Sequence, residues 1–148
     1  MNHSASPRNI DVLLARYAES HRNHTNEIIH FVCIPLIVLS LLGILWAIHP
    51  VVAIVATLAS LYYYTRLSRG FAIGMGVMSG VMLGVLALMP DMTVLPVSIA
   101  IFVVAWIGQF VGHKIEGKKP SFFEDLRFLL IGPVFVLSFL YRRMNLAY

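Results

Sequence analysis

Residues 28–65, IIHFVCIPLIVLSLLGILWAIHPVVAIVATLASLYYYT, form a stretch without a single Asp, Glu, Lys or Arg. Two further stretches without these residues cover 70–90 and 92–113. Each is long enough for the roughly 20 apolar residues that a helix needs to cross a bilayer. Of the 148 residues 59% are hydrophobic and only 12% are charged, which is more apolar surface than a soluble domain of this length can bury. We therefore predict a membrane protein with several spans.

Short polar segments divide this apolar sequence into four spans. Residues 49–50 and 90–91 are tight turns, and Arg66 and Arg69 separate the second span from the third. The expected spans are 27–48, 50–64, 71–89 and 94–116. The predicted fold class is an all-α polytopic membrane helix bundle, formed by a single membrane-embedded domain over residues 1–148.

The N-terminal segment is predicted to lie beside the spans. Residues 9–22 indicate an amphipathic helix, because their apolar residues recur at helical spacing while the charged ones lie elsewhere on the helix. The apolar residues are Ile10, Leu13, Leu14 and Tyr17. We expect residues 1–8 to be disordered.

The C-terminal segment is predicted to form a fifth, shorter helix over residues 121–143. Ser121 and Glu124 have the spacing of a capping box at its start. The uncharged part, 128–141, is too short to cross a bilayer, so a re-entrant or interfacial helix is expected.

Glycines recur every fourth residue along the third span, at Gly76, Gly80 and Gly84. Small residues at this interval let helix backbones approach closely within a bilayer. We therefore expect this face to pack against a neighbouring helix.

The distribution of positive charge predicts which side of the membrane each end of the spans faces. Basic residues flank only one end of the spans, at Arg8, Arg16, Arg22, Arg66, Arg69, Lys114, Lys118, Lys119, Arg142 and Arg143. The positive-inside rule places both termini in the cytosol, in the inner membrane of a bacterium or the endoplasmic reticulum of a eukaryote. The net charge of +4 comes from these short clusters, so no nucleic-acid partner is expected. A single cysteine, Cys33, excludes an internal disulfide.

Two polar stripes lie at the cytosolic ends of different spans, and each occupies one helix face. The first consists of Asn23, Asn26 and His30. The second consists of Trp106, Gln109, His113 and Glu116. Ionisable groups beside hydrocarbon are costly and therefore indicate function. Imidazoles with a carboxylate suit non-haem iron, although zinc also accepts them, and the amides are expected to orient the ligating imidazoles.

A third histidine, His21, imposes a geometric condition. On one unbroken helix it would lie about 13 Å from His30 and on the opposite face. Both can therefore bind one metal ion only if the chain breaks within residues 22–26, where the Asn-rich sequence permits a turn. His49 lies in a short turn at the other end of the spans, and we expect it to be structural.

Two motifs follow one another along the chain. They are Tyr17-xxx-His21-x-Asn23-xx-Asn26-xxx-His30-xxxx-Pro35 and Trp106-Ile-x-Gln109-Phe-x-Gly112-His113. Together they resemble the 2-hydroxy fatty acid dioxygenase family of membrane proteins, over nearly the whole chain. The resemblance implies an Fe(II)-dependent enzyme that uses O2 to shorten 2-hydroxy fatty acids by one carbon, which is fatty acid α-oxidation. It implies metal binding by His21, His30 and His113, with Glu116 as fourth ligand or as a support for the ligands.

The expected partners are a 2-hydroxy fatty acid, O2 and the lipid bilayer. A 2-hydroxy carboxylate can chelate iron through two oxygens while its acyl tail extends between the spans. Two other functions stay open at this point. One is a non-enzymatic membrane scaffold or lipid-binding protein whose polar stripes hold helices together. The other is a zinc- or proton-coupled small carrier. The oligomeric state also stays open, with a homo-oligomer as one option.

Overall fold

The computed structural model describes residues 8–148 as six α-helices and one short 3-10 helix, without a strand among them. The elements are α1 (Asn9–Ala18), α2 (His24–Ile48), α3 (Pro50–Leu67), α4 (Arg69–Leu88), α5 (Asp91–Glu116), η1 (Ser121–Phe123) and α6 (Phe128–Arg143). Helices α2, α3, α4 and α5 are long and apolar enough to cross a membrane. The predicted all-α bundle with four spans is confirmed. The disorder expected for residues 1–8 concerns a segment that, apart from Arg8, lies outside the described residues.

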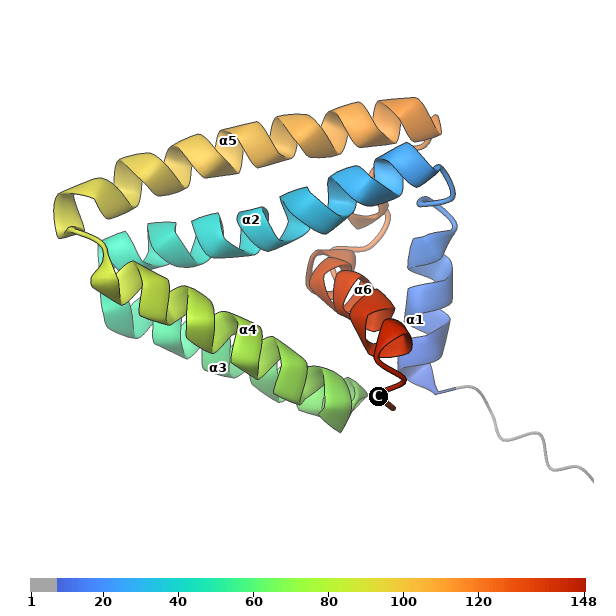
Figure 1. Cartoon of the computed structure of the whole chain (residues 1–148), viewed down its shortest axis with the longest axis horizontal. Helices are drawn as coiled ribbons and strands as arrows, with labels where there is room; N and C mark the ends of the chain where they lie inside the picture. Colours follow the sequence, from blue (N-terminus) through green and yellow to red (C-terminus); the bar gives the residue numbers. More distant parts are fainter. Residues whose placement is uncertain (1–7) are drawn as a thin grey trace, which may run out of the picture.

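The four long helices form two antiparallel pairs that diverge from one end (Figure 1). Helix α2 packs against α5 and α3 packs against α4, while α6 lies between the pairs at their wide end and α1 packs on α6. At the narrow end the turn between α2 and α3 contains His49, whose ring Nδ1 accepts a hydrogen bond from the Val51 N–H at 3.2 Å. This cap on α3 agrees with the structural role expected for His49, which stays a prediction. The start of α2, the end of α5 and the C-terminus all lie at the opposite, wide end of the bundle (Figure 1).

Helix α1 buries the apolar face that its sequence predicts. Its four apolar residues pack against buried residues of α6 in one core cluster, which contains Ile10, Leu13, Leu14, Tyr17, Phe128, Ile131, Val134 and Phe135. The helix ends at Ala18, earlier than the expected residue 22, so residues 19–23 form a turn before α2. This turn supplies the chain break that His21 requires.

The helix expected over 121–143 is divided in two. Residues 121–123 form η1, and α6 begins only at Phe128. The capping-box prediction is wrong, because Ser121 makes no side-chain cap and its Oγ is buried without a hydrogen-bond partner. Asp125 instead binds Arg127 through a contact of 2.6 Å between Oδ2 and Nη2.

Small residues allow α2 and α5 to pack closely at three levels. A Cβ added to the glycine at each level would collide with the other helix, in the pairs Gly43 with Ser98, Gly108 with Cys33 and Gly112 with Asn26. By contrast, a Cβ added at Gly80 or Gly84 would meet nothing within 4 Å. The close approach expected at these two glycines of α4 therefore does not occur between the described residues, and the tightly packed pair is α2 with α5.

We expect Gly112→Ala to destabilise the fold by about 1–3 kcal/mol, the usual cost of overpacking. The new Cβ would collide with Asn26 Oδ1 and come within 3.4 Å of Ile29 Cγ2. Gly80→Ala is the matched control, because its new methyl group enters open space. Thermal unfolding of the detergent-solubilised proteins, followed by circular dichroism, compares the two. Equal unfolding midpoints would contradict the close packing of Gly112 on Asn26.

Candidate metal centre

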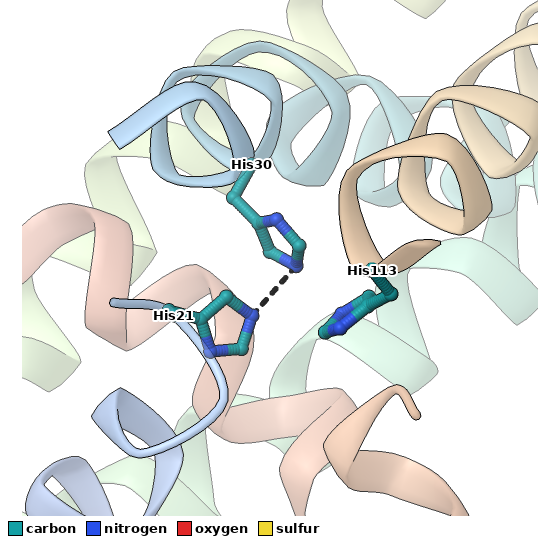
Figure 2. Close-up of side chains that lie close together, drawn as sticks. All are labelled: His21, His30 and His113. Atoms are coloured by element: carbon teal, nitrogen blue, oxygen red, sulfur yellow. Dashed lines mark hydrogen bonds between the residues drawn. The ribbon is translucent and has the colours of Figure 1, made fainter. Parts of the chain in front are cut away.

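Three histidines from separate parts of the chain lie close together (Figure 2). His21 comes from the turn after α1, His30 from the first turns of α2, and His113 from the last turn of α5. Each offers one ligand atom, and these atoms lie within 4.8 Å of one another. The side chains are buried, with exposed fractions of 6%, 2% and 4%. The structure therefore brings together the three histidines that the resemblance implied as ligands.

Backbone carbonyls fix the orientation of two of these rings. His21 Nδ1 donates to the Tyr17 carbonyl at 2.7 Å, and His30 Nδ1 donates to the Asn26 carbonyl at 3.0 Å. A carbonyl oxygen only accepts, so the proton of each neutral imidazole is on Nδ1. The Tyr17 ring also stacks on His21 at 4.2 Å between ring centroids. Both Nε2 atoms are left with a free lone pair, which is the form that binds a metal ion.

The close approach of these two ring nitrogens suits a shared cation. The Nε2 atoms of His21 and His30 are 2.8 Å apart, as the dashed line in Figure 2 marks. When each ring carries its proton on Nδ1, neither Nε2 has a proton to place between them. Burial lowers the pKa of His21 to about 4, so this imidazole is neutral at pH 7. The Nδ1 of His113 is buried without a hydrogen-bond partner. The three imidazoles therefore fit a bound metal ion, and nitrogen ligands of this kind suit iron and zinc.

Glu116 holds the turn that carries His21. One carboxylate oxygen, Oε1, accepts from the Arg22 backbone N–H at 3.0 Å. The other, Oε2, accepts from the Asn23 backbone N–H at 2.8 Å and from the Asn26 side-chain amide at 3.1 Å. Both oxygens are thus engaged with N–H donors, and Glu116 is not a member of the three-histidine group. This arrangement matches the supporting role; the role of fourth ligand stays a prediction.

Further contacts tie the same turn to its neighbours. The Asn26 side-chain amide also donates to the Ser20 carbonyl at 3.2 Å. Lys118 Nζ donates to the Glu19 carbonyl at 2.8 Å. The Asn23 side chain caps α2 by accepting from the Thr25 N–H at 2.9 Å. The turn is therefore attached both to the start of α2 and to the segment after α5.

The predicted amides differ in what they contact. Asn26 orients His30, although through its backbone carbonyl and not its side chain. Asn23 acts on the turn and the helix start. No hydrogen bond among the described residues joins Gln109 to an imidazole, and its side-chain nitrogen is buried without a partner. The orienting role expected for Gln109 stays a prediction without a contact to support it.

A cavity of about 290 Å³ adjoins the histidines. His30 and His113 line it together with Gln109, and most of its wall is apolar. The apolar part includes Ile34, Ile37, Val38, Leu41, Phe102, Phe122, Phe128 and Leu129. Ser121 also lines the cavity, and sequence reasoning missed it because its spacing to Glu124 indicated a helix cap. The arrangement places a hydrophobic chamber directly beside a candidate metal site.

One family model matches this chain. It is described as "2-hydroxy-palmitic acid dioxygenase Mpo1-like" and matches residues 8–144, a range that includes all three histidines. No curated protein and no solved structure matches the chain.

Proposed function

We propose that this chain, which belongs to the Mpo1-like family of 2-hydroxy-palmitic acid dioxygenases, is an Fe(II)-dependent enzyme that shortens 2-hydroxy fatty acids by one carbon in fatty acid α-oxidation. The observation that carries the proposal is the buried contact of 2.8 Å between the Nε2 atoms of His21 and His30, with His113 beside them. A scaffold would not need to bury three imidazoles around a shared point. A metal-dependent enzyme would need these imidazoles as ligands.

The choice of Fe(II) over zinc follows from the chemistry of dioxygen. Zinc has no redox chemistry, whereas a dioxygenase needs a metal that exchanges electrons. Bound Fe(II) would supply those electrons together with open positions for the substrates. His21, His30 and His113 would hold it. Three protein ligands leave room for other ligands on the ion.

The surrounding side chains exclude water and receive the acyl chain. Tyr17 stacks on His21 on one side, and Phe135 lies 5.5 Å from the same ring between centroids. The apolar cavity beside His30 and His113 would take up methylene groups of a fatty acid, each contributing about 0.8 kcal/mol when buried. The substrate proposed is therefore an amphiphile with its polar group at the histidines.

The proposed orientation places the metal centre at the cytosolic face. The basic residues beside α3, α4 and α5 flank the same ends of the helices as the histidines. The positive-inside rule assigns this end, and both termini, to the cytosol. The membrane would be the inner membrane of a bacterium or the endoplasmic reticulum of a eukaryote.

Oxygen uptake by the purified protein tests the proposed function. After anaerobic loading with Fe(II), we expect about one iron per chain and O2 consumption with 2-hydroxypalmitic acid, in the absence of 2-oxoglutarate. Mass spectrometry should detect an acid one carbon shorter. Palmitic acid without the hydroxyl group is the control substrate. Failure to retain iron after loading, or zinc that iron cannot replace, would overturn the assignment.

A further inference from the structure

Unpaired polar atoms gather in the cavity beside the histidines. The described residues contain five buried side-chain N or O atoms without a hydrogen-bond partner. Four of them belong to residues that line this cavity, namely Trp106, Gln109, His113 and Ser121. Buried polar groups are normally paired, and leaving one unpaired costs free energy. Their concentration in one cavity indicates that a ligand provides the missing partners.

Three of these four atoms can donate a hydrogen bond to a ligand whatever the tautomer of His113. Trp106 Nε1 and Gln109 Nε2 carry N–H groups, and Ser121 Oγ carries a hydroxyl. Trp106 and Gln109 lie one helical turn apart on α5, and the Trp106 ring packs on Phe122, the neighbour of Ser121, at 5.2 Å between centroids. The complement of such a donor set is a group that accepts several hydrogen bonds, such as a carboxylate.

The rest of the cavity fits a long apolar tail. The wall along α2 runs from His30 to Leu41, which corresponds to a rise of about 16 Å. No Asp, Glu, Lys or Arg lines it among the described residues. Leu41 and Leu129 line the cavity and are 45% and 48% exposed on the apolar surface of the bundle. A chain can therefore extend from the polar end toward the lipid.

We propose that Trp106 Nε1, Gln109 Nε2 and Ser121 Oγ form a head-group subsite for the carboxylate of a long-chain fatty acid. The acyl tail lies along α2 toward Leu41 and Leu129. The ligand class rests on the proposed function, but the subsite itself does not depend on a bound metal. Neutral donors bind the carboxylate at one end of the cavity, so the carbon next to it is held beside His30 and His113.

Equilibrium binding to metal-free protein tests this subsite. The protein is stripped with a chelator in detergent, and the binding of radiolabelled palmitic acid is compared with that of 1-hexadecanol, which has the same tail without a carboxylate. We expect Ser121→Ala and Gln109→Leu each to weaken palmitic acid binding about tenfold or more, since each removes a hydrogen bond to a charged group. Binding of 1-hexadecanol should change little. Ser98→Ala is the matched control, because Ser98 is a buried serine of α5 that does not line the cavity.

Three results would overturn the subsite. The first is a wild-type protein that does not prefer the acid to the alcohol. The second is a pair of variants that keep the wild-type preference, and the third is an equal loss of both ligands in Ser121→Ala with an unchanged unfolding midpoint. Ser121→Ala removes a single atom and decides the question if Gln109→Leu does not fold. Iron retention and O2 uptake are measured separately, so acid-selective binding without turnover would reject the proposed reaction and keep the subsite.

Discussion

Replacing His30 with alanine will remove the metal and abolish turnover. His30 is 2% exposed, and its Nε2 faces His21 directly. With this imidazole removed, two protein ligands would remain in a buried site where no described carboxylate joins the group. We expect iron per chain to fall from about one to near zero, and O2 uptake to fall with it. Elemental analysis and an oxygen electrode measure the two quantities on the same preparation.

The control for this substitution is His24→Ala, six residues earlier in the sequence. The His24 side chain is exposed, and its Nδ1 lies 3.6 Å from Glu27 Oε2. This variant should retain both iron and activity. A His30→Ala protein that still held one iron per chain and consumed O2 would show that the iron is bound elsewhere.

Removing the Glu116 carboxylate will weaken metal binding while leaving the three imidazoles in place. Glu116→Ala deletes the acceptor for the backbone N–H groups of Arg22 and Asn23, which belong to the turn that carries His21. Groups that orient metal ligands typically contribute 10- to 100-fold in metal affinity. We therefore expect about this loss in Fe(II) affinity, measured by competition with a chelator.

A spectroscopic measurement separates a positioning role from direct ligation. When Glu116→Ala is saturated with Co(II), the visible absorption bands should match those of the wild type, because the ligand atoms are unchanged. Turnover should recover as the Fe(II) concentration rises. A changed Co(II) spectrum at saturation would instead identify Glu116 as the fourth ligand. Glu27→Ala, which alters another carboxylate at the start of α2, is the control.

The sequence predicted the spans because hydrophobicity is a local property. A charge-free stretch of about 20 residues has few alternatives to a membrane helix, whatever its neighbours are. The polar turns at 49–50 and 90–91 then indicated where α2 and α4 end. The same local reasoning identified the buried face of α1, since its apolar residues recur at helical spacing.

Sequence reasoning was less successful where a residue could have either a local or a distant partner. Ser121 has the spacing of a helix cap, yet its hydroxyl lies unpaired in the cavity. Gly80 has the spacing of a packing motif, yet the close glycine contacts between the four spans are made by glycines on α2 and α5. In both cases the local pattern was compatible with two environments, and only long-range packing selected one.

The sequence alone predicted the helices, their polar ends and three candidate histidines. The tertiary structure decided that α1 stops at Ala18 and that Glu116 holds the following turn, which places His21 against His30. It also decided that an apolar chamber with unpaired donors adjoins them. The physical reason is distance along the chain: helix formation depends on neighbours within a few residues, whereas the site joins atoms that more than 80 residues separate in the sequence.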